Sequence, residues 1–440
     1  MESGANLTPD KMREFLCQVF LDTLAGISIP RVFRNKVEYE RGVLRVEQDL
    51  YDLSSFERVL VIAIGKAAHT MLEALVAQTG PSLQGIVCSI PTPSQQPGFR
   101  YFVGGHPLPT EESILGAKAI LRALSGLNEH ALVIYLISGG ASAMVEVPRD
   151  EDISLDDLTE TYRVLVHSGA TIGEINGIRK HLSAVKGGRL AQAAFPARQV
   201  SIMVSDVPEN TLDALASGPT MPDSSTEADC YRLAETYGLS AKLPQSVSKI
   251  FKERAIEETP KADDPAFVNS RWWPILSSAS SVQVASGLLS KHGFAVEIDN
   301  TPDDWPFGRA AEHLLRRVRA LRETTARVAL VSAGEITVSV PNTGGVGGRN
   351  QHFVLHCAQQ IAGESITVLS AGTDGIDGDS PAAGAVVDGA TDIRARQMGL
   401  DLKRALESFD SFPLLEKLGD TIVTGPTGNN VRDLRILLAY

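Results

Sequence analysis

Hydrophobic residues along the chain follow two kinds of pattern. Near the N-terminus, apolar side chains recur every three to four residues from Met12 to Leu24, which predicts an amphipathic helix packed on a larger body. Further along, short and nearly continuous apolar runs alternate with helical stretches, and such runs are typical of strands buried on both faces of a sheet. The clearest runs are Val59 to Ile64, Leu132 to Ile137, Val200 to Val204, Val328 to Ser332 and Ile366 to Leu369.

This alternation predicts the α/β class, with a mostly parallel sheet covered by helices. At 440 residues the chain exceeds the size at which one core usually keeps growing, so we expect two domains. The periodicity weakens between about Tyr237 and Pro274, and Lys, Glu, Asp and Pro crowd into residues 253–265. We therefore place one domain at residues 1–255 and a second, smaller α/β domain at residues 256–440.

Each of these runs leads directly into small or polar residues. In parallel α/β sheets, ligands collect at the carboxyl ends of strands, so these segments are candidate parts of a binding site. The segments are Gly65-Lys66, Ser138-Gly139-Gly140, Ser205-Asp206, Ala333-Gly334-Glu335 and Ser370 to Asp374.

The first two of these strand ends suit an anion. Lys66 stands between a strand and a helix, where a lysine can pair with phosphate or carboxylate oxygens, although a surface lysine fits equally well because the P-loop spacing is absent. Ser138, Gly139 and Gly140 form a glycine-rich turn whose backbone amides could approach an anion. A tight turn that needs glycine for its dihedral angles is the alternative.

The middle of the chain carries a basic stretch in an acidic protein. Lys180, Lys186 and Arg189 could build the local positive field that an anionic substrate requires, and a solvated helix face would carry the same charges. Asp206 could bind Mg²⁺ or accept a proton, whereas Ser217 belongs to a sharp turn with exposed donors.

The last third holds the strongest local signal. A glycine-rich run from Gly344 ends in Gly348, Arg349 and Asn350 and opens an apolar helix, an arrangement that suits an anion with charge spread over several oxygens. Asp374 lies in a loop that lacks EF-hand spacing and suits Mg²⁺ or ribose hydroxyls, with a solvated turn as the alternative. Near the C-terminus, Val431 to Leu438 reads as an amphipathic segment.

Composition narrows the functional classes. The net charge of -12 argues against a basic surface for nucleic acid. Four scattered cysteines indicate reduced thiols rather than disulfides or a zinc site. Because the N-terminal Met1 to Ala5 shows no leader pattern and no apolar run is long enough for a membrane span, we expect a cytoplasmic protein without a membrane partner.

The chain also lacks a nucleophile elbow, a GxGxxG fingerprint and a metal-type His/Cys cluster. Lysine, arginine and aspartate at several strand ends therefore indicate phosphate handling without a covalent intermediate.

These turns, in this order, resemble the glycerate 2-kinase family from about Met12 to Leu438. The resemblance implies a Rossmann-like N-terminal domain joined to a smaller MOFRL-type domain, with ATP and Mg²⁺ as co-reactants, D-glycerate as acceptor and 2-phosphoglycerate as product. It also implies that Lys66 and Arg349 match the functional lysine and arginine, which fits groups that neutralise charge on a transferring phosphoryl group. The matching motifs are Gly65 to Ala68, Gly105 to Pro109, the Ser138 turn, Arg179-Lys180, Lys186 to Gly188, Ser205 to Val207, Ala216 to Thr220, Gly347 to Gln351, Gly372 to Gly378 and Thr424 to Gly428.

The chain departs from the family pattern at Glu209-Asn210, where Gly-Asp is common, and at Ala141, where a third glycine is common. The departure at Glu209-Asn210 leaves open a noncatalytic nucleotide- or acid-binding relative. A hydroxypyruvate reductase is the other alternative, because relatives of the family have been described as such, and the missing dinucleotide fingerprint argues against it. A homo-oligomer is also open, because the Trp272-Trp273 pair suits either an interface or packing within the chain.

Overall fold

The computed structural model describes residues 8–340 and 345–440. Gly344, residues 1–5 and the side chain of Glu209, all used in the sequence predictions, lie outside the described parts. The described chain forms two compact units. Unit 1 combines helix α1 (Pro9–Gly26) with Leu276–Tyr440, and unit 2 is Ile29–Ile275.

A six-stranded sheet with the order β6-β5-β4-β7-β8-β9 forms the centre of unit 2. The pairings from β6 through β8 are all parallel, so the carboxyl ends of these five strands share one edge. Every residue of the central strand β7 is buried, as expected for a strand covered on both faces. The strands are β4 (Arg58–Ile64), β5 (Gln84–Ser89), β6 (Phe99–Val103), β7 (Ala131–Ser138), β8 (Arg198–Val204) and β9 (Ser270–Leu276).

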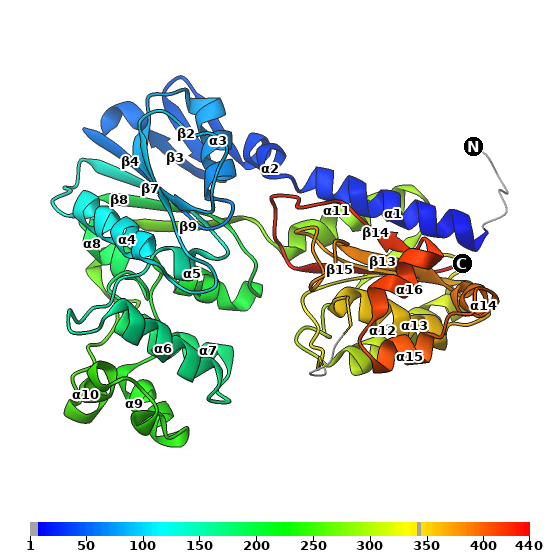
Figure 1. Cartoon of the computed structure of the whole chain (residues 1–440). Coiled ribbons are helices and arrows are strands. Elements are labelled where there is room, and N and C mark those ends of the chain that lie inside the picture. Colours follow the sequence, from blue (N-terminus) through cyan, green and yellow to red (C-terminus); the bar gives the residue numbers. More distant parts are fainter. Residues whose placement is uncertain (1–7, 341–344) are drawn as a thin grey trace. The chain divides into compact units, whose positions relative to one another are not determined.

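Two groups of helices surround this sheet. One group packs on the sheet, and the other forms its own apolar cluster, visible as α6, α7, α9 and α10 in Figure 1. The sheet helices are α3 (Ala68–Thr79), α4 (Glu111–Leu124), α5 (Ala141–Met144) and α8 (Arg189–Ala194); the others are α6 (Leu155–Val166), α7 (Ile172–Leu182), α9 (Glu227–Thr236) and α10 (Gln245–Glu253). Helix α2 (Ile29–Lys36) packs on α3 and on β1. A small antiparallel sheet adds β1 (Val37–Glu40), β2 (Val43–Val46) and β3 (Asp49–Asp52), and four 3₁₀ helices are η1 (Leu53–Ser55), η2 (Glu209–Ser217), η3 (Leu239–Ala241) and η4 (Pro265–Phe267).

Unit 1 also contains a six-stranded sheet, but its strands are mixed in direction. The order is β10-β11-β15-β12-β13-β14, and β15 is antiparallel to both of its neighbours. Because β11 and β12 run the same way on either side of β15, their carboxyl ends share an edge with the start of β15. The strands are β10 (Ala295–Ile298), β11 (Val328–Ala333), β12 (Ile366–Gly372), β13 (Gly384–Asp388), β14 (Thr421–Ile422) and β15 (Asp433–Ala439).

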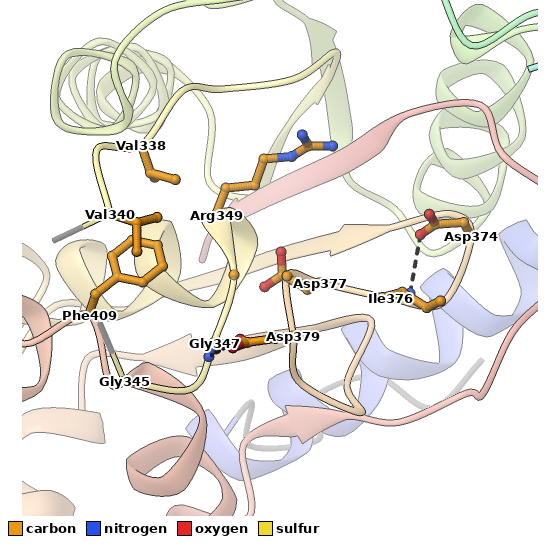
Figure 2. Close-up of a pocket in the computed structure, with 12 residues that line it drawn as sticks. Val338, Val340, Gly345, Gly347, Arg349, Asp374, Ile376, Asp377, Asp379 and Phe409 are labelled. Atoms are coloured by element: carbon orange, nitrogen blue, oxygen red, sulfur yellow. Dashed lines mark hydrogen bonds between the residues drawn. The ribbon is translucent and has the colours of Figure 1, made fainter. Parts of the chain in front are cut away.

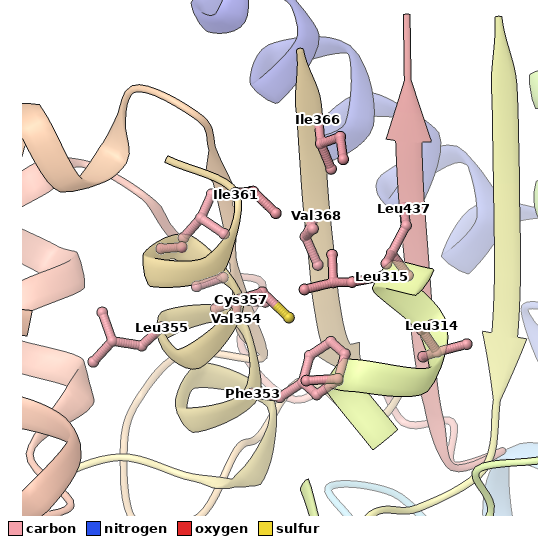
Figure 3. Close-up of a cluster of buried hydrophobic side chains, with 14 of the residues drawn as sticks. Leu314, Leu315, Phe353, Val354, Leu355, Cys357, Ile361, Ile366, Val368 and Leu437 are labelled. Carbon is pink, nitrogen blue, oxygen red and sulfur yellow. The ribbon is translucent and has the colours of Figure 1, made fainter. Parts of the chain in front are cut away.

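Both faces of the unit 1 sheet are covered. On one face, α12 and α13 bury an apolar cluster, in which Phe353 and Cys357 of α13 lie close to Val368 of β12 and Leu437 of β15 (Figure 3). On the other face, α1 and α11 pack against β11, β12 and β15. The helices are α11 (Ser278–Lys291), α12 (Phe307–Thr324), α13 (Arg349–Gln360), α14 (Thr391–Gln397), α15 (Leu402–Glu407) and α16 (Ser411–Leu418).

The structure confirms the α/β class, the two-unit organisation and all five predicted strands. The segment Val431 to Leu438, however, was wrongly predicted to be amphipathic. Its strand, β15, is buried along its whole length because it lies between β11 and β12.

The compact units also differ from the predicted boundary at residue 255. The charged segment that follows belongs to unit 2, where His181 Nε2 lies 2.8 Å from Glu258 Oε1 and Asp223 N–H donates to Pro260 O over 3.1 Å. The N-terminal helix α1 belongs to unit 1, because its apolar face packs on α11 and on the sheet.

Three further predictions concern the cysteines, the tryptophan pair and membrane spans. All four cysteines are free thiols. Both indoles of the tryptophan pair bond within unit 2, Trp272 Nε1 to Thr220 O over 2.8 Å and Trp273 Nε1 to Asp49 Oδ2 over 2.9 Å. Among the described helices none is by itself long and apolar enough to cross a membrane; α1 and α2 meet that test only when taken together as a bent pair.

Candidate active site

Three of the predicted strand ends meet at one edge of the unit 2 sheet. β7 lies between β4 and β8, and both pairings are parallel. The edge therefore brings together Lys66 after β4, the Ser138-Gly139-Gly140 turn after β7 and Asp206 after β8, although these residues are far apart in sequence.

Two hydrogen bonds join the Lys66 turn to the Ser138 turn. Lys66 N–H donates to Gly139 O over 2.9 Å, and Ala67 N–H donates to Ser138 Oγ over 3.0 Å. Gly65 has a φ of +115°, and a Cβ at this position would collide with Ser138, so only glycine fits here. Since Ser138 is 2% exposed, its hydroxyl ties the two turns together from the inside.

The glycine turn separates Lys66 from Asp206. A Cβ on Gly139 would collide with the Asp206 carboxylate, and one on Gly140 would lie 3.0 Å from Lys66 Cγ. Gly140 also has a left-handed φ of +83°. The turn therefore presents bare backbone between a cation and a carboxylate, and helix α5 after it is only one turn long.

A pocket of about 290 Å³ opens beside this turn. Ser142 Oγ and Ser217 Oγ lie 2.9 Å apart in its wall. Ala216 and Ser217 have φ values of +54° and +60°, conformations that cost non-glycine residues about 1–3 kcal/mol each and that cluster at functional sites. The polar residues that line the pocket are His106, Ser142, Asn176, Arg179, Asp206 and Ser217.

The two predicted lysines of the basic stretch are internal rather than pocket residues. Lys180 Nζ lies 3.0 Å from both Asp213 Oδ2 and Asp223 Oδ1. Lys186 Nζ is fully enclosed and bonds to Glu146. Burial lowers the pKa of Lys186 to about 8, although Glu146 acts in the opposite direction.

The pocket includes three residues that the sequence did not single out for it. Asn176 and Arg179 lie three residues apart on α7, which places them on one helix face, whereas Lys180 points into its ion pairs. His106 lies near Lys66, and burial, followed by the Lys66 charge, lowers its pKa. The three-residue spacing of Asn176 and Arg179 indicates that they share a helix face. The sequence alone could not show that this face, rather than the face with Lys180, lies on the pocket.

A second strand edge, in unit 1, carries Arg349. The guanidinium donates from Nε to Asp433 Oδ2 over 2.6 Å and from Nη1 to Glu335 Oε2 over 3.0 Å. Burial acts to lower the pKa of Arg349, but the two carboxylates outweigh it and raise this pKa above its usual value. The charge of Arg349 is therefore balanced inside unit 1.

The start of α13 is capped by the protein's own carboxylate. Asp377 accepts the backbone N–H groups of Asn350 and Gln351 over 3.0 and 2.9 Å, and both side-chain amides over 3.2 and 3.0 Å. Burial raises the pKa of Asp377 to about 6, while these donors act in the opposite direction. The amide donors that the sequence offered to a substrate anion are thus bonded to Asp377, and Gly348 is needed because a Cβ there would collide with it.

A larger pocket, of about 560 Å³, lies at this second edge. Figure 2 shows Val338, Val340 and Phe409 at one end and Asp374 with Ile376 at the other. Asp374 Oδ1 accepts the Ile376 N–H over 3.1 Å, and Asp379 Oδ1 accepts the Gly347 N–H over 3.2 Å. The pocket combines an apolar wall with carboxylates and a glycine loop.

Neither edge holds a closed metal cage. Within residues 8–340 and 345–440 no group of three or more His, Cys, Asp or Glu side chains could hold a metal ion. The predicted ligands Asp206 and Asp374 each line a pocket, one in each unit. Mg²⁺ is commonly held by one or two carboxylates together with substrate phosphates and water, so Asp206 in the unit 2 pocket, and Asp374 among the three carboxylates of the unit 1 pocket, fit this ion.

Comparison with known proteins places this architecture in context. Residues 15–252 match a family model described as a domain of unknown function, DUF4147, and residues 328–433 match the MOFRL family model.

Curated relatives match over most of the chain. A D-glycerate 2-kinase from Thermotoga maritima is 37% identical, over 87% of this chain and 91% of its own length. A relative from Agrobacterium vitis, whose name assigns it provisionally to the hydroxypyruvate reductases, is 36% identical over 87% of both chains. The crystal structure of a glycerate kinase from Thermotoga maritima superposes with a TM-score of 0.84 at 34% identity, covering 98% of this chain and 100% of the other.

Proposed function

The chain belongs to the glycerate 2-kinase family, and on that premise we propose that it transfers the γ-phosphoryl group of ATP to D-glycerate, giving 2-phosphoglycerate. The observation that carries the proposal is the unit 2 edge, where Lys66 and Asp206 flank a bare glycine turn beside a pocket of about 290 Å³. A pocket of this size suits a small acid, and the nearby cations suit its negative charge.

Lys66 is the proposed catalytic lysine. Among the described residues its ammonium group forms no ion pair, so its charge is available to phosphate oxygens. Positive charge that is already in place where negative charge grows lowers the barrier of phosphoryl transfer. The backbone of Gly139 and Gly140 and the hydroxyl of Ser217 are the proposed neighbours of the substrate oxygens.

Arg349 is the proposed second phosphate-stabilising residue. Its ion pairs with Glu335 and Asp433 orient the guanidinium, and a third of the side chain is exposed, which leaves an accessible edge. Gly348 and Asn350 act with Asp377 to shape the loop that carries Arg349. Ser138, Lys180 and Lys186 act in the same supporting way in unit 2.

Mg²⁺ is the proposed metal co-reactant, with Asp206 and Asp374 as the candidate ligands. When bound with ATP, Mg²⁺ neutralises phosphate charge and orients the nucleotide. Asp206 lies against the glycine turn, and Asp374 lies in the larger pocket of unit 1, so each carboxylate faces space that a substrate could enter.

A coupled assay for ADP release with ATP, Mg²⁺ and D-glycerate tests the proposal. We expect turnover, and analysis of the product separates 2-phosphoglycerate from 3-phosphoglycerate. Absence of turnover in folded protein would contradict the kinase activity.

Hydroxypyruvate reduction is the competing activity, because one similar protein carries that name. The turn between β4 and α3 reads Gly65-Lys66-Ala67-Ala68, so it lacks the glycine pattern that admits a dinucleotide pyrophosphate. Incubation with hydroxypyruvate and NADH should leave the cofactor reduced, and clear NADH oxidation would overturn the kinase assignment.

We place the protein in the cytoplasm, with ATP and D-glycerate as small-molecule partners and without nucleic acid or membrane partners. The net charge of -12 argues against a nucleic acid partner. A homo-oligomer is compatible with this function, and analytical ultracentrifugation would determine the state.

A further inference from the structure

Arg179 occupies a defined place in the unit 2 pocket. It lies on α7, whose first turn is fixed by a capping box between Thr171 and Glu174. Asn176, one helical turn earlier, lines the same pocket. The neighbouring Lys180 lies on another face of the helix, where Asp213 and Asp223 neutralise it.

The guanidinium of Arg179 lies over an aromatic ring. Its Cζ lies 4.2 Å from the centroid of the Tyr162 ring. The buried Nε has no hydrogen-bond partner, and among the described residues no carboxylate forms an ion pair with this arginine. In the described part of the chain, Arg179 is therefore a cation without an ion-pair partner.

The buried carboxylate of Glu146, which bonds to Tyr162, is already committed to other partners. Tyr162 Oη and Lys186 Nζ both donate to its Oε2, and Ser183 Oγ donates to its Oε1 over 2.6 Å. Glu146 and Lys186 are both completely buried and balance each other's charge. This buried group holds the Tyr162 ring, over which Arg179 lies in the wall of the pocket.

The chemistry of the pocket indicates which anion Arg179 receives. A planar guanidinium matches a carboxylate through two parallel hydrogen bonds, whereas Lys66 is a point charge suited to phosphate oxygens. Ser142 and Ser217 supply hydroxyls in the same wall. A small 2-hydroxy acid presents a carboxylate directly beside the hydroxyl group that reacts.

On the premise of the proposed function, we propose that Arg179 binds the carboxylate of the acceptor acid and so determines its selection, and that Tyr162 and Glu146 position Arg179. The carboxylate would complete the hydrogen bonding of the guanidinium and supply its missing counter-ion. The acceptor hydroxyl is then held at a fixed distance from that carboxylate.

The test compares D-glycerate with its neutral amide as phosphoryl acceptors. Arg179→Met keeps an apolar stem on the Tyr162 ring and removes the charge. We expect kcat/KM for D-glycerate to fall by about 10²- to 10³-fold, with the KM for ATP and turnover of the amide changing little, because a buried charge pair has lost one partner. Arg163→Met, at an exposed arginine on the neighbouring helix α6, is the matched control and should change neither acceptor.

Two further variants keep the test sharp. Arg179→Lys preserves the charge but not the planar pair of N–H donors, and kcat/KM should fall about tenfold for D-glycerate and not for the amide. This variant also provides the test if Arg179→Met does not fold. Tyr162→Phe keeps the ring and removes its bond to Glu146; we expect a several-fold higher KM for D-glycerate with kcat nearly unchanged. An unchanged preference for D-glycerate over the amide in the arginine variants would overturn the proposal.

Calorimetric binding of D-glycerate and glycolate without ATP separates this inference from the kinase activity. Binding that requires Arg179 in a protein without kinase turnover would support the carboxylate site and contradict the proposed function. Wild-type protein that binds neither acid would overturn the carboxylate site.

Discussion

At the unit 2 edge, Lys66 and Arg179 have no carboxylate in an ion pair among the described residues, whereas at the unit 1 edge Arg349 is paired with Glu335 and Asp433. The helix at the unit 1 edge also has its first amides bonded to Asp377. Both edges follow the same topological rule, since each gathers the carboxyl ends of strands that run in one direction. The difference shows that this rule locates a site without fixing its charge balance.

The cations at the two edges should also differ in how much they contribute to stability. A cation without an internal partner can be removed at little structural cost, but removing one member of a buried ion pair leaves its partner unsatisfied. Variants at the two edges should therefore separate into those that lose activity alone and those that lose activity and stability.

Lys66→Met should have the largest effect on activity. We expect kcat to fall by about 10³-fold or more, because the variant lacks the charge that stabilises the transferring phosphoryl group. The midpoint of thermal unfolding should stay close to that of the wild type, since Lys66 is exposed and makes no ion pair in the described chain. Lys118→Met, at an exposed lysine on α4, is the control for loss of a surface charge, and near-normal turnover in the Lys66 variant would contradict its catalytic role.

Arg349→Met should lower both the activity and the stability of the protein. We expect kcat to fall by about 10²-fold and unit 1 to lose roughly 2–3 kcal/mol of stability, because Asp433, whose side chain is only 3% exposed, is left with an unpaired charge. Denaturant unfolding measures the second effect. Adding Asp433→Asn to the variant should restore part of the stability without restoring turnover.

An Arg349 variant with wild-type stability would show that the pair with Asp433 contributes little. Removing a cation would then cost little stability at either edge, and the two edges would differ only in how they bind substrate.

Asp377→Asn tests the internal cap of α13. The substituted amide keeps one acceptor oxygen but turns an NH₂ group toward two of the four groups that donate to Asp377, so we expect unit 1 to lose roughly 2–3 kcal/mol of stability. Asp379→Asn is the matched control, because this exposed residue accepts a single N–H, and it should cost less than about 1 kcal/mol. Equal losses in both variants would contradict a special role for the Asp377 cap.

This cap shows where prediction from sequence reached its limit. Gly348, Arg349 and Asn350 could be recognised as a glycine-rich start of a helix that favours negative charge. The sequence could not show that Asp377, from a distant loop, supplies that charge. Local pattern predicts the donors, whereas the acceptor depends on tertiary packing.

The same limit explains the basic stretch of unit 2. Lys180 and Arg179 are adjacent in sequence, and a difference of one residue in helical phase places one among buried carboxylates and the other on the pocket. The strand ends at Lys66, Gly139 and Asp206 were predictable, because parallel strands align their carboxyl ends whatever their separation in sequence. Insertion of β15 between β11 and β12 was not, since the order of strands in a sheet depends on tertiary packing that a local pattern does not show.

His352 offers the finest test of how closed the unit 1 edge is. The ring lies between Phe307 and Phe409, at centroid distances of 4.6 and 4.5 Å, and burial, followed by the charge of His356, lowers its pKa from 6.5 to about 4. Between these pH values the unfolded chain binds more protons than the folded chain, so the contribution of His352 is fully present above pH 6.5 and is lost as the pH falls toward 4.

His352→Gln should therefore make unfolding less dependent on pH. The stability difference between wild type and variant should shift by about 3 kcal/mol against the wild type as the pH falls from 7 to 4, measured by denaturant unfolding at each pH. The opposite contribution of Asp377, whose pKa is raised, is present in both proteins and cancels in this difference. A difference that stays constant with pH would mean that water reaches the His352 ring in the folded state, and that the unit 1 edge is open in the way that the unit 2 pocket is.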